Sequence, residues 1–136
     1  MDKELAGARE RLIAAHVQAE NDRDLDAVMA TFGHPRYEHV STGQVFDGED
    51  EVRALLTAQW EQLPSDMRWE ALGFYHGTDG VMVETRTLGT AASSNPIDFV
   101  TVNLFGFEGS SLILERCWFD RLTAAEQLGA IELPTA

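Results

Sequence analysis

The sequence contains a single cysteine, Cys117, among its 136 residues. A disulfide within the chain is therefore impossible, and so is a zinc site built from several cysteines. The four histidines do not show the H-x-x-x-H spacing of helical metal ligands, so no metal site is predicted. No segment approaches the roughly 20 apolar residues of a membrane span. The N-terminal MDKELAGARE also lacks the apolar region of a signal peptide.

Positive charge is scarce as well. Ten Lys and Arg residues stand against 23 Asp and Glu residues, which gives a net charge of −13. Nucleic acids and anionic membranes would repel such a chain, so neither is an expected partner. Hydrophobic residues make up 44% and charged residues 24%, which is ordinary for a folded protein. We expect residues 1–136 to form a single cytoplasmic domain with one core.

Helical periodicity dominates the first half of the chain. Apolar residues at helical spacing predict a helix over Glu4–Glu20, with His16 beside its apolar stripe. A histidine in that position is more often a hydrogen-bonded core residue than a catalyst. Asp24 is a suitable N-cap for a short second helix. A third helix is predicted between Gly48 and Pro64, where proline ends it.

The second half of the chain is strand-like. Strands are predicted over Arg36–Val40, Gln44–Phe46, Met67–His76, Val81–Thr90 and Ile97–Phe107, and a final strand closes at Asp120. A T-x-x-E capping box predicts that a closing helix begins near Thr123. Helices followed by antiparallel strands indicate the α+β class. A curved antiparallel sheet with the N-terminal helices over its concave face would make a cone with a pocket in its mouth.

The Ile97–Phe107 strand is apolar on both faces. It turns Ile97 and Phe99 to one side and Val100 and Val102 to the other. The helices can cover one face only, so a monomer would leave apolar area in water at roughly 25 cal/mol per Å². The sequence therefore predicts an isologous homodimer through the convex face of the sheet.

Five segments together resemble the SnoaL-like branch of the nuclear-transport-factor-2-like (NTF2-like) superfamily. They are HVQAENDRDLDAVMATF, FGHPRYEHVSTG, Phe46-Asp47-Gly48, VMVETRTLGT and ERCWFDRLTAAEQLG. The resemblance runs from about Leu12 to Ile131 and implies a cone-shaped curved sheet with a pocket. The family includes polyketide cyclases, ketosteroid isomerases, dehydratases, limonene-epoxide hydrolases and binders with no known chemistry. Its enzymes usually use acid–base catalysis without a metal or organic cofactor, so the resemblance implies none here.

The epoxide-hydrolase branch supplies one set of site positions. Its water-orienting Tyr and Asn match Tyr37 and His39, so only the tyrosine is kept. Its Arg, its middle-strand Asp and its last-strand Asp match Thr85, Thr87 and Cys117. All three depart from that pattern, which argues against epoxide hydrolysis by that carboxylate relay.

The polyketide-cyclase branch has an Asp near the end of the last strand as general acid/base, and Asp120 is the nearest match. Strand alternation places Glu115 and Cys117 on one face and Trp118 and Asp120 on the other, unless a bulge intervenes. An aspartate held against aromatic rings would have its pKa raised toward working pH, as acid–base catalysis requires. Alternatively, Asp120 pairs with a neighbouring arginine or supports capping of the last helix.

These considerations lead to a hypothesis for the site. Asp120 is the expected acid/base, and His39 and Tyr37 are expected to stabilise an enolate oxygen. The expected substrate-binding residues are Trp60, Thr85, Thr87, Glu115 and Cys117. His39 has the alternative of a half-exposed strand residue, and Cys117 that of an inert buried thiol.

The predicted function is a cofactor-free, polyketide-cyclase-like cyclisation or isomerisation of an apolar carbonyl compound, in the lyase or isomerase class. The expected partner is a small hydrophobic molecule. Three alternatives stay open: a non-catalytic binder of such molecules, an epoxide-hydrolase- or dehydratase-like enzyme, and an interaction module that supplies a dimer surface only.

Overall fold

A computed structural model describes residues 1–134, so residues 135–136 of the predicted domain lie outside the described part. The helices are α1 (Lys3–Asn21), α2 (Leu25–Thr31), α3 (Glu49–Gln62) and α4 (Arg121–Gln127). The strands are β1 (Arg36–His39), β2 (Gln44–Asp47), β3 (Arg68–His76), β4 (Gly80–Thr90), β5 (Pro96–Glu108) and β6 (Ser111–Trp118). Within residues 1–134, no helix is long and apolar enough to cross a membrane.

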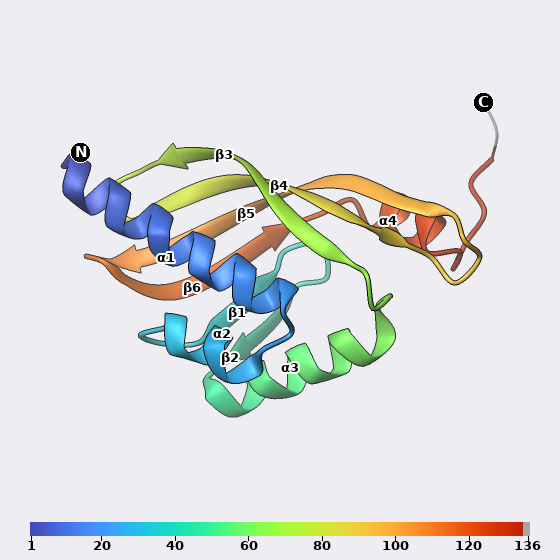
Figure 1. The fold of residues 1–136 in the computed structure, drawn as a ribbon, viewed down its shortest axis with the longest axis horizontal. Coiled ribbons are helices and arrows are strands. Elements are labelled where there is room, and N and C mark those ends of the chain that lie inside the picture. The colour runs from blue at the N-terminus through green and yellow to red at the C-terminus, as the bar shows by residue number, and fades with distance from the viewer. Residues whose placement is uncertain (135–136) are drawn as a thin grey trace.

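The six strands form one unclosed sheet in the order β2-β1-β6-β5-β4-β3. Neighbouring strands are antiparallel except β1 and β6, which run parallel. The sheet curves, and α1 lies across it with α2 and α3 beside β1 and β2 (Figure 1). The predicted α+β class and the helices over the concave face are confirmed.

The concave face holds the core. Ile13 of α1 is fully buried against a cluster of strand residues that includes Val83 and Phe105. A second cluster joins α2 and α3 to β1 through Val28, Leu56 and other buried side chains. Complete burial of such a side chain contributes about 1.5–3 kcal/mol, so the apolar stripes of the helices fix them over the sheet.

The end of β6 differs from the prediction. The strand stops at Trp118, and α4 begins at Arg121 with Asp120 as its N-cap. The predicted helix start near Thr123 is therefore wrong by two residues. Asp120 Oδ1 accepts hydrogen bonds from the backbone N–H groups of Leu122 and Thr123, so Asp120 and not Thr123 caps the helix.

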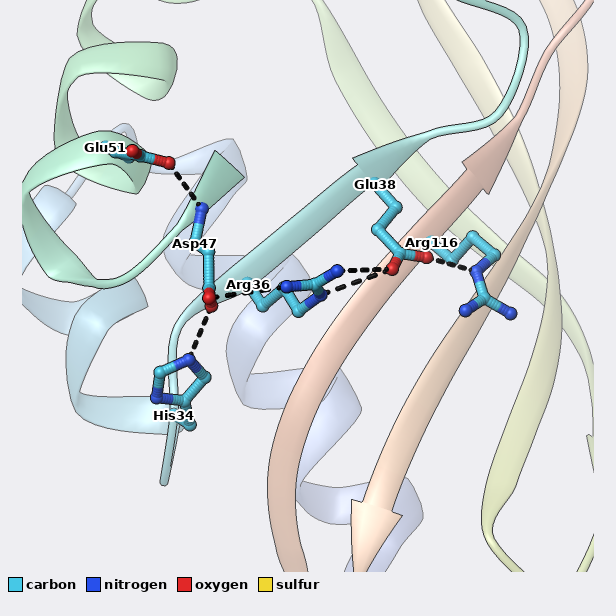
Figure 2. Close-up of polar contacts among 6 residues, drawn as sticks. All are labelled: His34, Arg36, Glu38, Asp47, Glu51 and Arg116. Carbon is cyan, nitrogen blue, oxygen red and sulfur yellow. Dashed lines mark hydrogen bonds and ion pairs between the residues drawn. The ribbon is translucent and has the colours of Figure 1, made fainter. Parts of the chain in front are cut away.

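The parallel pairing of β1 with β6 carries a charged network on the convex face of the sheet (Figure 2). Glu38 of β1 accepts hydrogen bonds from its cross-strand partner Arg116 and from Arg36, at 3.0 Å and 3.2 Å from Nη2 and Nε of the latter. Arg116 first, and Arg36 with it, hold the pKa of Glu38 below its usual value. Asp47 of β2 binds His34 at 2.6 Å and continues the network. These contacts tie β1 and β2 to the rest of the sheet.

Candidate functional site

The concave side of the sheet encloses a pocket of about 700 Å³. Its walls come from the strands and from α1, α3 and α4. Seven aromatic residues line it: Tyr37, Phe46, Trp60, Trp69, Phe99, Phe105 and Phe119. Among the predicted site residues, the pocket brings together Tyr37, His39, Trp60, Thr85, Thr87, Glu115 and Cys117, and it does not include Asp120.

A buried polar cluster lies at one end of this pocket. His16 and Glu20 come from α1, Tyr37 from β1 and Glu115 from β6. His16 Nε2 lies 2.9 Å from Glu115 Oε2, 3.2 Å from Glu20 Oε1 and 3.0 Å from the Tyr37 hydroxyl. The Tyr37 hydroxyl donates to Glu20 Oε1 at 2.5 Å. Asn103 of β5 donates to Glu115 Oε1 at 2.7 Å, so both oxygens of that carboxylate are engaged. We call His16, Glu20, Tyr37, Glu115 and Asn103 the His16 cluster.

Thr31 fixes the proton on the other ring nitrogen of His16. The Thr31 hydroxyl donates to the carbonyl oxygen of Val28 at 2.6 Å. Its oxygen therefore accepts the hydrogen bond from His16 Nδ1, which is 2.7 Å away. Because Nδ1 carries a proton, any proton exchanged with the pocket moves through Nε2.

The charge state of His16 follows from its neighbours. Burial of the ring alone would lower its pKa, but the carboxylates of Glu20 and Glu115 outweigh burial and raise it to about 10. His16 is accordingly an imidazolium at neutral pH, bridging two carboxylates. Burial raises the pKa of Tyr37 well above its usual value, and the two nearby carboxylates add to the effect, so its hydroxyl stays a donor.

His39 and Cys117 line the pocket beside the cluster. The His39 ring packs edge-on against Phe46 and Phe119, and it makes no hydrogen bond within residues 1–134. Burial lowers the pKa of His39, so the ring is neutral near pH 7. Burial, with Glu115 and Glu20, raises the pKa of Cys117 to about 12, which agrees with an inert thiol.

Asp120 lies outside the pocket and is exposed. Besides the two backbone N–H groups, it accepts a hydrogen bond from the Thr123 hydroxyl at 2.8 Å. These hydrogen bonds from Thr123, together with that from Leu122, lower its pKa. A lowered pKa is the opposite of what an acid/base needs at neutral pH, and the contacts match the alternative of a helix cap.

The remaining predicted residues form the pocket wall on β4 and α3. Thr85 and Thr87 are buried and face the concave side, and Trp60 of α3 lines the same pocket. Thr101 donates to the backbone carbonyl of Thr85 at 3.4 Å. Thr87 Oγ1 has no hydrogen-bond partner in the described part of the chain, although it is buried.

Three members of the cluster were not predicted as site residues. The sequence favours a core residue at His16, and Glu20 and Asn103 belong to no motif that indicates a site. One signal was present for Glu20, because it follows His16 by four residues and therefore shares its helix face.

The cluster also offers three metal-ligand atoms, from His16, Glu20 and Glu115, all within 4.8 Å of one another. A metal ion requires a neutral imidazole with a free lone pair. The protonated Nε2 of His16 already joins both carboxylates, so at neutral pH the residues fit a proton better than a metal ion.

The family model for the SnoaL-like domain matches residues 13–115. No curated protein matches the sequence. Among solved structures, a candidate SnoaL-like polyketide cyclase from Jannaschia sp. CCS1 has 18% identity and a TM-score of 0.78, over 92% of this chain and 94% of that one. SalBIII, an epoxide hydrolase/cyclase-like enzyme of pyran ring formation in salinomycin, has 17% identity and a TM-score of 0.73, over 90% and 97%.

A third similar structure has a ketosteroid isomerase-like fold and comes from Catenulispora acidiphila DSM 44928, in complex with trimethylamine. It has 14% identity and a TM-score of 0.76, over 87% of this chain and 92% of that one. At these identities the structures show a shared fold, and the family model covers most of the chain. The chain belongs to the SnoaL-like domain family.

Proposed function

We propose that the protein catalyses cofactor-free proton transfer at a carbon next to a carbonyl group, within a cyclisation or isomerisation of an apolar substrate. The observation that carries the proposal is the His16 cluster, a buried set of ionisable groups at one end of an aromatic pocket. Proton transfer next to a carbonyl needs a carboxylate base and a hydrogen-bond donor for the enolate oxygen, and the pocket contains both.

Glu20 is the proposed base. Its Oε1 accepts from Tyr37, whereas no hydrogen bond reaches Oε2 within residues 1–134. Its side chain is 13% exposed and that of Glu115 is 6% exposed, so Glu20 is the more accessible carboxylate. Glu115 holds His16 in place, and the imidazolium offsets part of the charge of the two carboxylates.

His39 is the proposed donor to the enolate oxygen, with Tyr37 supporting the base. The two residues lie two positions apart on β1 and face the same side, about 6–7 Å along the strand. That separation suits a carbonyl oxygen at His39 and an α-carbon beside Glu20. A neutral imidazole carries one N–H group, and this group can donate a hydrogen bond to the enolate oxygen.

In this proposal Glu20 takes the role that the family resemblance implied for Asp120. Similar structures support a small-molecule pocket. One is a candidate polyketide cyclase, and another holds trimethylamine. The substrate-binding roles of Trp60, Thr85, Thr87 and Cys117 remain part of the proposal, since all four line the pocket.

Hydrogen–deuterium exchange of 2-tetralone in D₂O, followed by NMR, tests this function. The wild-type protein should accelerate α-exchange above the buffer rate. The exchange rate of Glu20→Gln should be about 10²–10⁴-fold lower than that of the wild type, which is the usual contribution of a positioned base. Glu108→Gln makes the same chemical change at an exposed position outside the pocket and should exchange as fast as wild type. A wild-type rate equal to buffer, or a Glu20→Gln rate equal to wild type, contradicts the proposal. Recovery of bound but unexchanged ketone would favour the non-catalytic binder.

We also propose that the protein acts as a cytoplasmic homodimer. The convex face exposes 53% of Val100 and 36% of Trp118. Charges of both signs lie among these side chains, including the Arg86–Asp98 ion pair at 2.6 Å. A twofold axis brings such a mixed surface against itself, so opposite charges can meet around an apolar centre.

A further inference from the structure

The pocket carries negative charge and no cationic side chain. Its charged lining residues are Glu20, Glu51 and Glu115, and none of the residues that line it within 1–134 is Lys or Arg. His39 is neutral, because burial lowers its pKa. Within the described residues, the one positive group in contact with these carboxylates is the His16 imidazolium, which bridges Glu20 and Glu115. Three carboxylates and one imidazolium leave the pocket with a net negative charge.

Side chains of three neighbouring strands form a row on the concave face of the sheet. Trp69, Thr87 and Phe99 occupy paired positions on β3, β4 and β5, so their side chains form a row across the concave face. Trp60 of α3 also lines the pocket. Aromatic faces attract organic cations, most strongly when both are removed from water.

The buried hydroxyl of Thr87 independently indicates that a ligand group binds at this row. Its hydroxyl oxygen is buried without a hydrogen-bond partner in the described part of the chain, and the residue is only 2% exposed. Native proteins rarely leave such an oxygen unsatisfied. An ammonium N–H from a bound molecule would satisfy it.

The end of α1 lies against the same row. Asn21 donates to the backbone carbonyl of Trp69 at 2.9 Å and accepts from its backbone N–H at 2.8 Å, which brings the helix end that carries Glu20 to Trp69. Arg23, two residues later, directs its guanidinium to the backbone carbonyls of Trp60 and Pro64, not into the pocket. The Arg23 guanidinium is therefore hydrogen-bonded to backbone oxygens and does not place a positive charge in the pocket.

From this charge and this row we infer that the pocket binds an organic cation, namely an apolar molecule with a protonated amine seated against Trp60, Trp69 and Thr87. The inference names a substrate class for the pocket of the proposed function. Anionic ligands such as carboxylates and phosphate esters are excluded, since no cationic side chain is available to pair with them.

Three matched probes test the inference by calorimetry at pH 7: naphthylethylamine, naphthylethanol and naphthylacetate. The amine is protonated at that pH, as a lysine side chain is. It should bind about tenfold more tightly than the neutral alcohol, the range that a desolvated cation–aromatic contact supplies, and the acid should bind most weakly. Equal affinities for amine and alcohol, a tighter acid, or an amine that does not bind would overturn the inference.

Two tryptophan variants locate the cation. Trp69→Leu should reduce the ratio of amine to alcohol affinity to near one. Trp118→Leu removes an exposed tryptophan of the convex face and should leave that ratio unchanged. A ratio that survives Trp69→Leu would overturn the placement. Binding is measured without turnover, so the result is independent of whether 2-tetralone exchanges.

Discussion

Raising the pH from 7 to 8.5 should destabilise the protein through His16. The pKa of this residue is about 10 in the folded protein and 6.5 when unperturbed, because Glu20 and Glu115 overcome the effect of burial. The folded state therefore binds the proton more tightly than the unfolded state. The resulting stability is complete below pH 6.5 and is lost as the pH rises toward 10.

The size of the effect follows from the two pKa values. Their separation corresponds to a contribution on the order of 5 kcal/mol at low pH, at about 1.4 kcal/mol per unit. Between pH 7 and pH 8.5, linkage predicts a loss of about 2 kcal/mol in the free energy of unfolding. Cys117 has an unperturbed pKa of 9.0 and Tyr37 one of 10.0, so ionisation of these groups in the unfolded state adds little in this window.

Urea unfolding at pH 7 and pH 8.5, at constant ionic strength, measures this loss. His16→Gln should remove most of the pH dependence, whatever its own stability. His76→Gln should retain it, because His76 lies at the surface end of β3 and pairs with Glu10, outside the cluster. A wild-type free energy of unfolding that is equal at both pH values would refute the buried imidazolium.

Three further predictions concern the supports of the site and the assembly. Thr31→Val leaves the Nδ1–H of His16 without its acceptor and should lower the free energy of unfolding by about 1.5–3 kcal/mol in urea, whereas Thr31→Ser keeps the acceptor and should lose much less. Asp120→Ala should lower it by about 1 kcal/mol through loss of the N-cap and leave 2-tetralone exchange unchanged, and a loss of exchange would restore Asp120 as a catalytic candidate. Light scattering should give twice the chain mass of 15.1 kDa, and Val100→Asp should give a single chain, while a wild-type monomer would contradict the proposed dimer.

The sequence predicted the elements of this fold because their signals are local. The apolar stripe of α1 and the alternation of β5 depend on neighbours within a few residues, and both appear in the structure. The alternation of side chains along β6 also predicted correctly that Glu115 and Cys117 lie on the opposite face of the sheet from Trp118. Pairing of β5 with β6 is regular from Val102 to Gly106, so no bulge interrupts that alternation.

The site was less predictable because it is made by distant segments. His16 and Glu115 are 99 residues apart and meet because β6 lies between β1 and β5. The parallel pairing of β1 with β6 cannot be predicted from the sequence of either strand alone. The ending of β6 was ambiguous for a different reason, since an aspartate after aromatic residues suits both a pocket wall and a helix cap. The hydrogen bonds of Asp120 resolve that ambiguity in favour of the cap.

A crystal structure with 2-naphthol is the most direct test of the central claim, that the His16 cluster presents acid–base groups to a substrate in the pocket. This planar compound resembles the enol of 2-tetralone. Its ring should lie among the aromatic side chains of the pocket. Its oxygen should lie about 2.5–3.2 Å from His39 or from a polar atom of the cluster. A naphthol bound outside the pocket, or one whose oxygen points away from both His39 and the cluster, would contradict the account.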